Sequence, residues 1–246
     1  MTLEWTAETL RLSLFCADPV KVGVADWKMI TGQDEPQTIQ NTAARRTLSG
    51  PFLDGVLQIS AVGARLDCVI APRAPTETVE EGYIPQIGPL ALTSAAFADA
   101  TKPWIETLTV PIYRIAVAGT ALAKCDSLED AYSKLLGMLK SVKGDPTRMR
   151  ELAFRTNWPV ASQKMPGLTL NRITAWSVLQ VQLQLMTQDG SQTVVTETPA
   201  TQVIRLEVDH NTDAERTEPF DRPMLVPIYE ELVALVLENA ERGEVL

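Results

Sequence analysis

The sequence predicts an α+β protein made of two similar β-α-β-β-β-α units, in which antiparallel sheets carry helices packed on one face. The order of a strand, a helix, several strands and a helix occurs in residues 10–108 and again in residues 112–243. Several predicted strands alternate apolar with polar residues, as is typical of antiparallel sheets that expose one face to water. A chain of 246 residues with 45% hydrophobic residues can bury a sizeable core. We therefore expect a first unit in residues 1–109 and a second in residues 110–246, joined in one globule.

The first unit begins with a strand and a helix. Residues 10–16 alternate apolar and polar residues and then become continuously apolar, which predicts a strand inside a sheet. Asp18 and Pro19 follow, an N-cap residue and a proline suited to the first helical position. The helical spacing of apolar residues ends at Gly32, because glycine favours a helix stop. We predict a helix between Pro19 and Gly32 and a polar loop in residues 33–41.

Three short strands form the next predicted feature, a meander with glycine-containing turns. Its strands are expected at residues 45–49, 56–60 and 64–70. In the third strand three apolar side chains share one face: Leu66, Cys68 and Ile70. Arg65 and Asp67 share the other face, where they could pair with each other, at a gain of ~0–1 kcal/mol, or with a partner.

A proline-rich stretch and a helix complete the first unit. Residues 72–89 lack a periodic pattern and are predicted to form a loop or linker. A helix is expected from Thr93 or Ser94 to Leu108, and Pro103 should kink it or end it early.

The second unit opens with a strand in residues 112–120 and a helix with a clear start signal. Ser127 is the predicted N-cap, and Asp130 three residues later completes an approximate capping box. An apolar stripe then continues to Val142, and Gly144 ends the helix.

Strands dominate the rest of the second unit, beginning with a short one at residues 151–156. Leu179, Val181, Leu183 and Leu185 alternate with glutamines, which predicts a strand with one buried and one wet face. The remaining elements are a hairpin turn at Asp189-Gly190, a strand at residues 193–196, a strand with Ile204, Leu206 and Val208 inward, and a closing helix with Ile228, Leu232, Leu235 and Val236 inward.

Charge is spread unevenly along the chain. The net charge of −9 argues against a general nucleic-acid binder, because such proteins neutralise phosphates with Lys and Arg. Residues 207–246 hold eleven acidic residues and three basic ones, whereas residues 140–172 hold seven basic residues and two acidic ones. Such asymmetry can orient a partner, or it can reflect ordinary solvated faces.

Cysteine usage and the first residues of the chain predict a cytoplasmic protein. Cys16, Cys68 and Cys125 show neither disulfide nor metal-ligand spacing, and a sparse, odd count suits a reducing compartment. Glu4 and Glu8 stand where a signal peptide would be basic, and no apolar run is long enough to span a membrane.

No sequence motif for phosphate cradling, zinc proteolysis or a nucleophile elbow occurs in the chain. His210 is the single histidine, and it lies close to four acidic residues: Asp209, Asp213, Glu215 and Glu218. These residues could form a metal site or a general base. Against this, adjacent residues of a strand point to opposite faces, so Asp209 and His210 should diverge. We assign no catalytic residue, no metal site and no cofactor, and favour a protein without enzymatic activity.

Asn171, Arg172 and Trp176 are the candidate partner-binding residues. An amide, a planar cation and a large aromatic ring are suited to docking surfaces, and the latter two are enriched there. The alternative is that Trp176 and Ile173 fill the core while Asn171 makes a turn. This stretch, with Asp26-Trp27 and Arg65-Leu66-Asp67, resembles an uncharacterised, sporadically distributed bacterial protein family. The resemblance implies neither an activity nor a site residue.

We therefore expect a non-enzymatic protein-interaction component, such as a subunit, an adaptor or an inhibitor of a bacterial complex. Its partner would be another protein, in a hetero-complex or a homo-oligomer, without contact to a membrane. One alternative is a hydrolase or metal-dependent enzyme that uses His210 and the nearby acids. Another is an acidic nucleic-acid mimic that occupies a basic partner. Direct nucleic-acid binding through residues 140–172 is opposed by the net charge.

Overall fold

The computed structural model describes residues 3–75, 82–182, 184–189, 192–197 and 199–245. The strands of the first half are β1 (Thr6–Cys16), β2 (Thr38–Asn41), β3 (Arg45–Phe52), β4 (Gly55–Val62), β5 (Arg65–Pro72) and β6 (Gly88–Pro89). Those of the second half are β7 (Ile112–Cys125), β8 (Ala153–Asn157), β9 (Val160–Ala161), β10 (Thr169–Val181), β11 (Gln184–Asp189), β12 (Gln192–Glu197) and β13 (Thr201–Thr212). The helices are α1 (Val24–Thr31), α2 (Leu90–Thr107), α3 (Leu128–Met138) and α4 (Arg222–Arg242). Helices and a large antiparallel sheet confirm the predicted α+β class.

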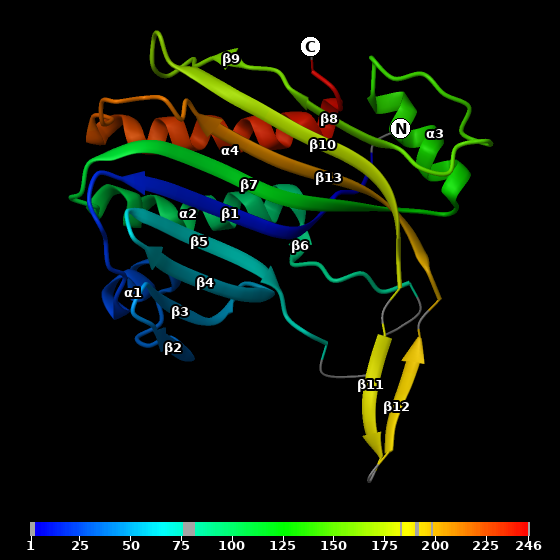
Figure 1. Cartoon of the computed structure of the whole chain (residues 1–246), viewed down its shortest axis with the longest axis horizontal. Coiled ribbons are helices and arrows are strands. Elements are labelled where there is room, and N and C mark those ends of the chain that lie inside the picture. Colours follow the sequence, from blue (N-terminus) through cyan, green and yellow to red (C-terminus); the bar gives the residue numbers. More distant parts are fainter. Residues whose placement is uncertain (1–2, 76–81, 183, 190–191, 198, 246) are drawn as a thin grey trace.

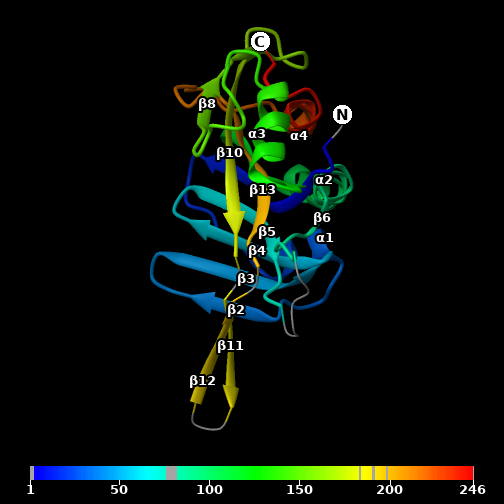
Figure 2. The ribbon, with the colours of Figure 1, turned by 90° about the vertical axis from the view of Figure 1, so that its right-hand side faces the viewer.

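One continuous antiparallel sheet of eleven strands forms the centre of the molecule (Figure 1). Its main path runs β2-β3-β4-β5-β1-β7-β13-β10-β8, while β6 pairs with β1 and β9 with β10. β1 and β7 pair in the middle of this path, so the sheet crosses the expected boundary at residue 109 without interruption. The edge strand β2 lies in residues that were expected to form a loop. β11 and β12 form a separate two-stranded ribbon that extends beyond the large sheet (Figure 2).

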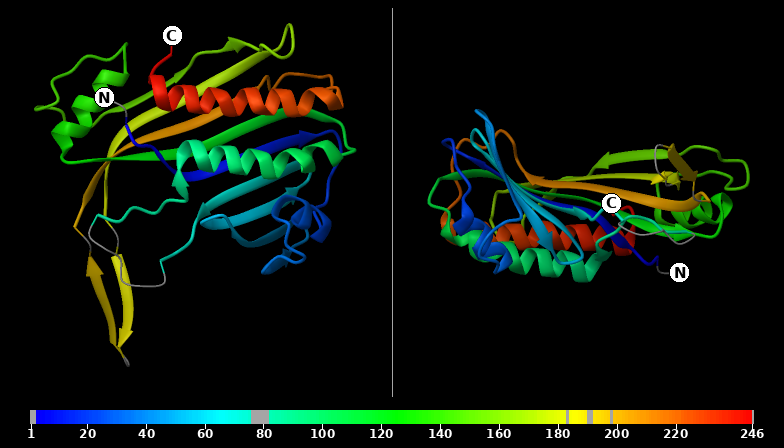
Figure 3. Two further views of the ribbon diagram at one scale, coloured as in Figure 1. Left: turned by 180° about the vertical axis from the view of Figure 1, so that it is seen from behind. Right: turned by 90° about the horizontal axis from the view of Figure 1, so that it is seen from below.

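The long helices α2 and α4 lie on the same face of the sheet (Figure 3). Successive residues of a strand point to opposite faces, so every second side chain of the central strands meets these helices. Leu12, Leu14 and Ile115 of the sheet are fully buried there, in one cluster with Trp104 of α2 and Tyr229 of α4. The apolar core therefore lies between the sheet and the two helices, and the other face of the sheet is free of α2 and α4.

The residues predicted to face inward in three elements are buried almost without exception. Leu235 is the exception, because it is only partly buried at the border of the core. The buried residues are Leu66, Cys68 and Ile70 of β5, Ile204, Leu206 and Val208 of β13, and Ile228, Leu232 and Val236 of α4.

α1 begins at Val24, five residues later than the proline-based prediction. Its N-cap is Gly23, whose backbone N–H donates to Asp26 Oδ2 at 2.7 Å. The Val20 N–H donates to the carbonyl oxygen of Gly63 at 3.0 Å. This long-range bond ties the segment before α1 to the turn between β4 and β5. The local N-cap signal was therefore overridden by a tertiary contact.

The ends of α2 and α3 also differ from the prediction. α2 begins at Leu90 and continues through Pro103, which does not end the helix. α3 ends at Met138, four residues before the predicted limit at Val142. The carbonyl oxygen of Met138 accepts the Glu244 N–H at 2.9 Å. The segment after α4 therefore supplies the donor that another turn of α3 would otherwise provide.

β10 begins ten residues before the strand that was predicted around Leu179. Leu179 is 37% exposed, so the buried face predicted for this strand is wrong at that position. The neighbouring Val178 lies opposite the core residue Ile204, so Leu179 points to the outer face. Its partner Val203 is fully buried on that face in a small cluster with Ile84 and Leu122, but Leu179 lies outside this cluster. Leu183 of this predicted strand, Gly190 of the predicted hairpin turn and residues 76–81 of the predicted loop lie outside the described residues.

Candidate interaction surface

The outer face of the sheet, away from α2 and α4, carries a band of polar and charged side chains. It collects every second residue of the central strands, because those between them point into the core. The register aligns these outer residues in rows across the sheet. Asp67, Ser13, Ala116 and Asn211 form one row, and Val69, Arg11, Ala118 and Asp209 form the next.

Asp67 on β5 anchors the first cluster of this band. Ser13 Oγ donates to Asp67 Oδ1 at 2.5 Å, and Arg65 donates to the same oxygen from Nε at 3.0 Å and from Nη2 at 2.7 Å. Of the two possibilities left open for Arg65 and Asp67, the structure shows that they pair with each other. Phe15 lies between Arg65 and Arg114, whose guanidinium carbons are 5.2 and 5.0 Å from the ring centroid. These cation–π contacts fix both guanidinium groups on the outer face.

A chain of amide side chains forms the second cluster. Asn211 Oδ1 accepts from Arg114 Nη2 at 3.0 Å and from Asn171 Nδ2 at 3.2 Å. Asn171 Oδ1 accepts from Asn157 Nδ2 at 3.1 Å. Asn211 Nδ2 in turn donates to Asp209 Oδ1 at 3.1 Å. The carboxylate of Asp209 is thus held in one orientation, and the candidate residue Asn171 belongs to the network that holds it.

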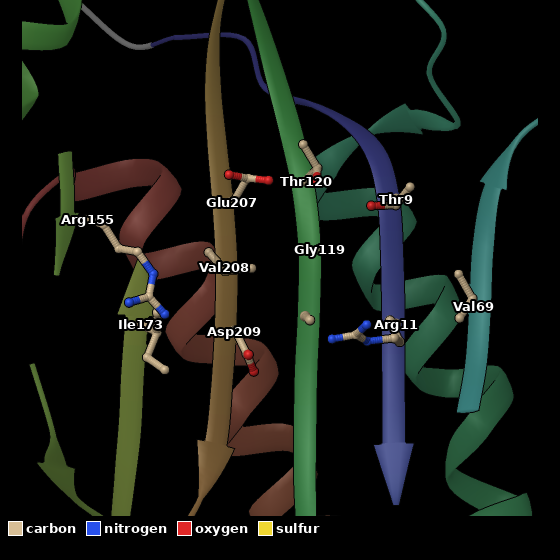
Figure 4. A pocket seen from close by; sticks show the side chains of 11 residues that line it. Thr9, Arg11, Val69, Gly119, Thr120, Arg155, Ile173, Glu207, Val208 and Asp209 are labelled. Carbon is tan, nitrogen blue, oxygen red and sulfur yellow. The ribbon is translucent and has the colours of Figure 1, made fainter. Parts of the chain in front are cut away.

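A pocket of about 440 Å³ opens on this face (Figure 4). Ala118 of β7 lies between Arg11 and Asp209 and contributes only a methyl group, so it leaves space between the longer side chains of β1 and β13. The polar lining consists of Thr9 and Arg11 of β1, Thr120 of β7, Arg155 of β8, and Glu207 and Asp209 of β13.

Two cations and two carboxylates face this pocket. In Figure 4 Arg11 points from β1 toward β7, Arg155 extends from β8 over β10, and Asp209 lies between them. Glu207 already has a partner, because Arg205 Nη2 lies 2.9 Å from its Oε1. Within the described ranges neither Arg11 nor Arg155 forms an ion pair, and Arg11 Nε is buried without a hydrogen-bond partner. The pocket therefore combines unused cationic donors with carboxylates whose positions are fixed.

His210 lies on the other face of β13 from Asp209, and it is fully buried. The predicted divergence of these two adjacent residues is confirmed. Burial, and to a smaller extent the neighbouring Arg172, lower the pKa of His210 to about 4. Asp213 and Glu215 follow the strand on an exposed turn. Among the residues that the structure describes, no three His, Cys, Asp or Glu side chains are grouped to hold a metal ion.

Two of the three candidate partner-binding residues point into the core and not to the outer face. Trp176 is 1% exposed, and its ring packs edge-on against Trp5 at a centroid distance of 6.0 Å. Arg172 is 3% exposed, and its Nε donates to Asn239 Oδ1 of α4 at 2.9 Å. Trp176 thus fills the core, as the alternative interpretation predicted, whereas Ile173 does not, because it lines the pocket on the outer face. Asn171 is the one candidate that the fold places on the outer face, in a strand and not in a turn.

The pocket residues Arg11 and Arg155 were not among the candidates from the sequence. Arg11 could have been found, because it alternates with the core leucines of β1 and therefore had to point outward. Arg155 gave no such signal, since its short strand carries a weak pattern. Their meeting at one pocket depends on the pairing of strands far apart in the chain, which no local pattern encodes.

Comparison of the chain with protein-family models, with curated proteins and with solved structures gives no match. Within the described part of the chain, every helix is too short or too polar to cross a lipid bilayer.

Proposed function

We propose that the chain is a non-enzymatic interaction component that binds another protein across the outer face of its sheet. The observation that carries this proposal is the pocket in which Arg11 and Arg155 have no ion-pair partner among the described residues, beside the fixed carboxylates of Glu207 and Asp209. A partner segment that carries both signs of charge would complement this arrangement.

The hydrogen-bond networks around the pocket support a docking role. Asp67, Asn211 and Asn171 are already held by neighbouring side chains, so binding would immobilise few additional rotamers. A surface that is ordered before it meets its partner loses less conformational entropy on association. The outer face is thus a preorganised polar surface, which suits recognition of another protein.

The ribbon of β11 and β12 supports the same proposal. It forms its own two-stranded sheet and extends beyond the large sheet (Figures 1 and 2). An isolated two-stranded ribbon is marginally stable in water, so contact with a partner would stabilise it. We expect the partner to contact both the ribbon and the outer face.

The acidic residues 207–246 favour this proposal over nucleic-acid mimicry. Several of their carboxylates are engaged within the protein and so do not form a free anionic surface. Glu231 accepts from Ser162 and from the backbone N–H of Gln163, and Glu244 accepts from Ser141. The remaining acids are divided among the outer face, the exposed loop between β13 and α4, and α4 itself.

The test compares the chain with two charge-reversal variants, Arg11→Glu and Arg155→Glu, in size-exclusion chromatography with light scattering and in affinity capture from the native host. A stable hetero-complex or homo-oligomer is expected, and each variant should weaken it about tenfold or more, because like charges are placed at the interface. Arg148→Glu is the matched control, since Arg148 is exposed and does not line the pocket. A strictly monomeric chain, or a complex that tolerates both pocket variants, contradicts the proposal.

We also infer that the two units are copies of one β-α-β-β-β-α unit. On one side of the β1–β7 pair the order is β1-β5-β4-β3, and on the other it is β7-β13-β10-β8. Each unit thus places its last strand next to its first, and each ends in a long helix, α2 or α4. Superposition in an experimentally determined structure tests this: if α2 fails to align with α4 when β1 is laid on β7, the inference is wrong.

A further inference from the structure

Strand β8 forms one edge of the large sheet, and within the described residues it pairs only with β10 (Figure 1). Just beyond its end, the Trp158 N–H donates to the Arg172 carbonyl of β10 at 3.2 Å. Backbone groups of successive strand residues point to opposite sides of the strand, so those of Thr156 also point toward β10. The N–H and carbonyl groups that point to the free edge are therefore those of Ala153, Arg155 and Asn157.

These three backbone N–H groups and three carbonyl groups are available to another strand. In the part of the chain that the structure describes, none of them takes part in a hydrogen bond to a loop or a side chain, and all three residues are exposed. An open edge of this kind is a template for a further strand. The opposite edge strand, β2, is shorter and polar, and all of its residues are exposed, so β8 is the better site.

The side chains of β8 differ between its two faces. On the outer face Arg155 is exposed and forms no ion pair with a described residue. On the other face Phe154 packs partly against the core, and Trp158 follows at even spacing and is 43% exposed. Side chains that lie opposite each other on paired strands share a face and interact. A strand added to β8 would therefore be complementary if it carried acidic residues on the outer face and apolar residues on the other.

The segment before β8 adds positive charge to this edge. Residues 140–152 contain four basic and two acidic residues, in a chain with a net charge of −9. The four basic residues are exposed and form no ion pair with any described residue: Lys140, Lys143, Arg148 and Arg150. One of the two acids, Asp145, already accepts a hydrogen bond from the Thr147 hydroxyl at 2.7 Å. A local field of this sign attracts and orients an acidic partner.

We infer that β8 receives an extended segment of the partner protein as an additional strand, in which acidic residues alternate with apolar ones. The inference rests on the proposed function, because Arg155 also lines the outer-face pocket. Backbone hydrogen bonds to the edge provide affinity in this mode of recognition, and alternate side chains provide specificity. A second copy of the chain fits less well, because full antiparallel overlap of two β8 strands places Arg155 opposite its own counterpart.

The test uses a capped peptide that alternates glutamate with valine, titrated into the full chain and followed by the fluorescence anisotropy of a dye on the peptide. Saturable binding is expected. Arg155→Gln and Trp158→Ala, at two exposed positions, should each weaken it about tenfold, through loss of a charge-assisted contact and of an apolar contact. Lys21→Gln, at an exposed position in the first half of the chain, is the matched control and should leave binding unchanged. A peptide with lysine in place of glutamate should not bind.

Hydrogen exchange of single backbone amides, followed by nuclear magnetic resonance, tests the mode of binding. The Arg155 N–H points to the free edge, so its exchange should slow about tenfold or more when the peptide binds. Exchange of the Thr156 N–H, which already faces β10, should change little. The inference is overturned by equal binding of the lysine peptide, by unchanged binding in both variants, or by an Arg155 amide that the peptide does not protect. Dimers of the chain that are lost in Trp158→Ala also overturn it, because a second copy would then occupy the edge.

The two proposals fail in different ways. If the peptide does not bind but the captured complex is still lost in Arg11→Glu, this inference is wrong and the proposed function is retained. If the capture experiment finds only a monomeric chain, the proposed function is contradicted, whether or not the peptide binds.

Discussion

Arg172 and His210 lie directly opposite each other on β10 and β13, and both side chains are buried on the core face of the sheet. Arg172 Nε donates to Asn239 Oδ1, and Arg172 Nη2 lies 2.9 Å from Glu238 Oε2. Both partners belong to α4. A buried cation beside a histidine therefore joins the sheet to the C-terminal helix, and it favours the neutral form of that histidine.

The first prediction concerns the link between Arg172 and α4. Arg172→Met should lower the free energy of unfolding by about 2 kcal/mol, because a hydrogen bond from a charged donor and an ion pair are lost while most of the buried volume is kept. Urea unfolding followed by circular dichroism measures the change. Arg148→Met, at an exposed position, is the control and should change stability by less than about 0.5 kcal/mol. Equal stability of the two variants would show that Arg172 does not hold α4.

The second prediction concerns the pH dependence of stability. The pKa of His210 is lowered to about 4 by burial and by Arg172, so below the ordinary value of 6.5 the unfolded chain binds a proton that the folded chain does not. The His210 contribution is therefore fully present above pH 6.5 and is lost as the pH falls toward 4. Its size is about 3 kcal/mol, from 1.36 kcal/mol per pKa unit.

Comparison with His210→Asn isolates this effect, because the carboxylates titrate alike in both proteins. Unfolding free energies from urea denaturation at pH 7 and pH 4.5 should differ more in the natural chain than in the variant. If the natural chain and His210→Asn lose the same free energy of unfolding between pH 7 and pH 4.5, His210 does not titrate with a lowered pKa.

The sequence predicted the elements whose signals are local. The leucines of β1, the alternation in β5 and the N-cap Ser127, whose Oγ accepts the Asp130 N–H at 3.1 Å, are formed as expected. Predictions failed where a contact between distant residues decides the outcome. α1 starts late because Val20 is bonded to Gly63, and the register of β10 with β13 sets the face to which Leu179 points. The candidate site depends on the same long-range pairing, so only its separate residues could be anticipated.

The third prediction concerns Gly119 of β7, which pairs with Leu10 of β1. A Cβ atom at Gly119 would lie 2.7 Å from the carbonyl oxygen of Thr9 and 3.2 Å from a methyl group of Leu10. Gly119→Ala should therefore destabilise the fold by about 1–3 kcal/mol, as overpacking does. Gly137→Ala in α3 is the matched control, because nothing lies within 4 Å of its Cβ position. The control should stabilise by about 0.5–1 kcal/mol, since alanine is the better helix former.

Thermal unfolding of the two alanine variants decides this prediction. The melting temperature should fall for Gly119→Ala and rise slightly for Gly137→Ala. A Gly119→Ala protein as stable as the natural chain would show that the two strands can separate enough to admit a methyl group.

The last prediction concerns the ribbon of β11 and β12. Val181 and Thr201 are paired at the ends of β10 and β13, so a two-residue turn can join these strands directly. Replacing residues 182–200 with Asn-Gly should change the free energy of unfolding by less than about 1 kcal/mol, because shortening a connection has a small entropic effect and the ribbon is a separate sheet. The same deletion should abolish the complex with the partner in the capture experiment. If the complex persists after the deletion but is lost in Arg11→Glu, the expected role of the ribbon is contradicted. The partner would then bind to the outer face through the pocket alone.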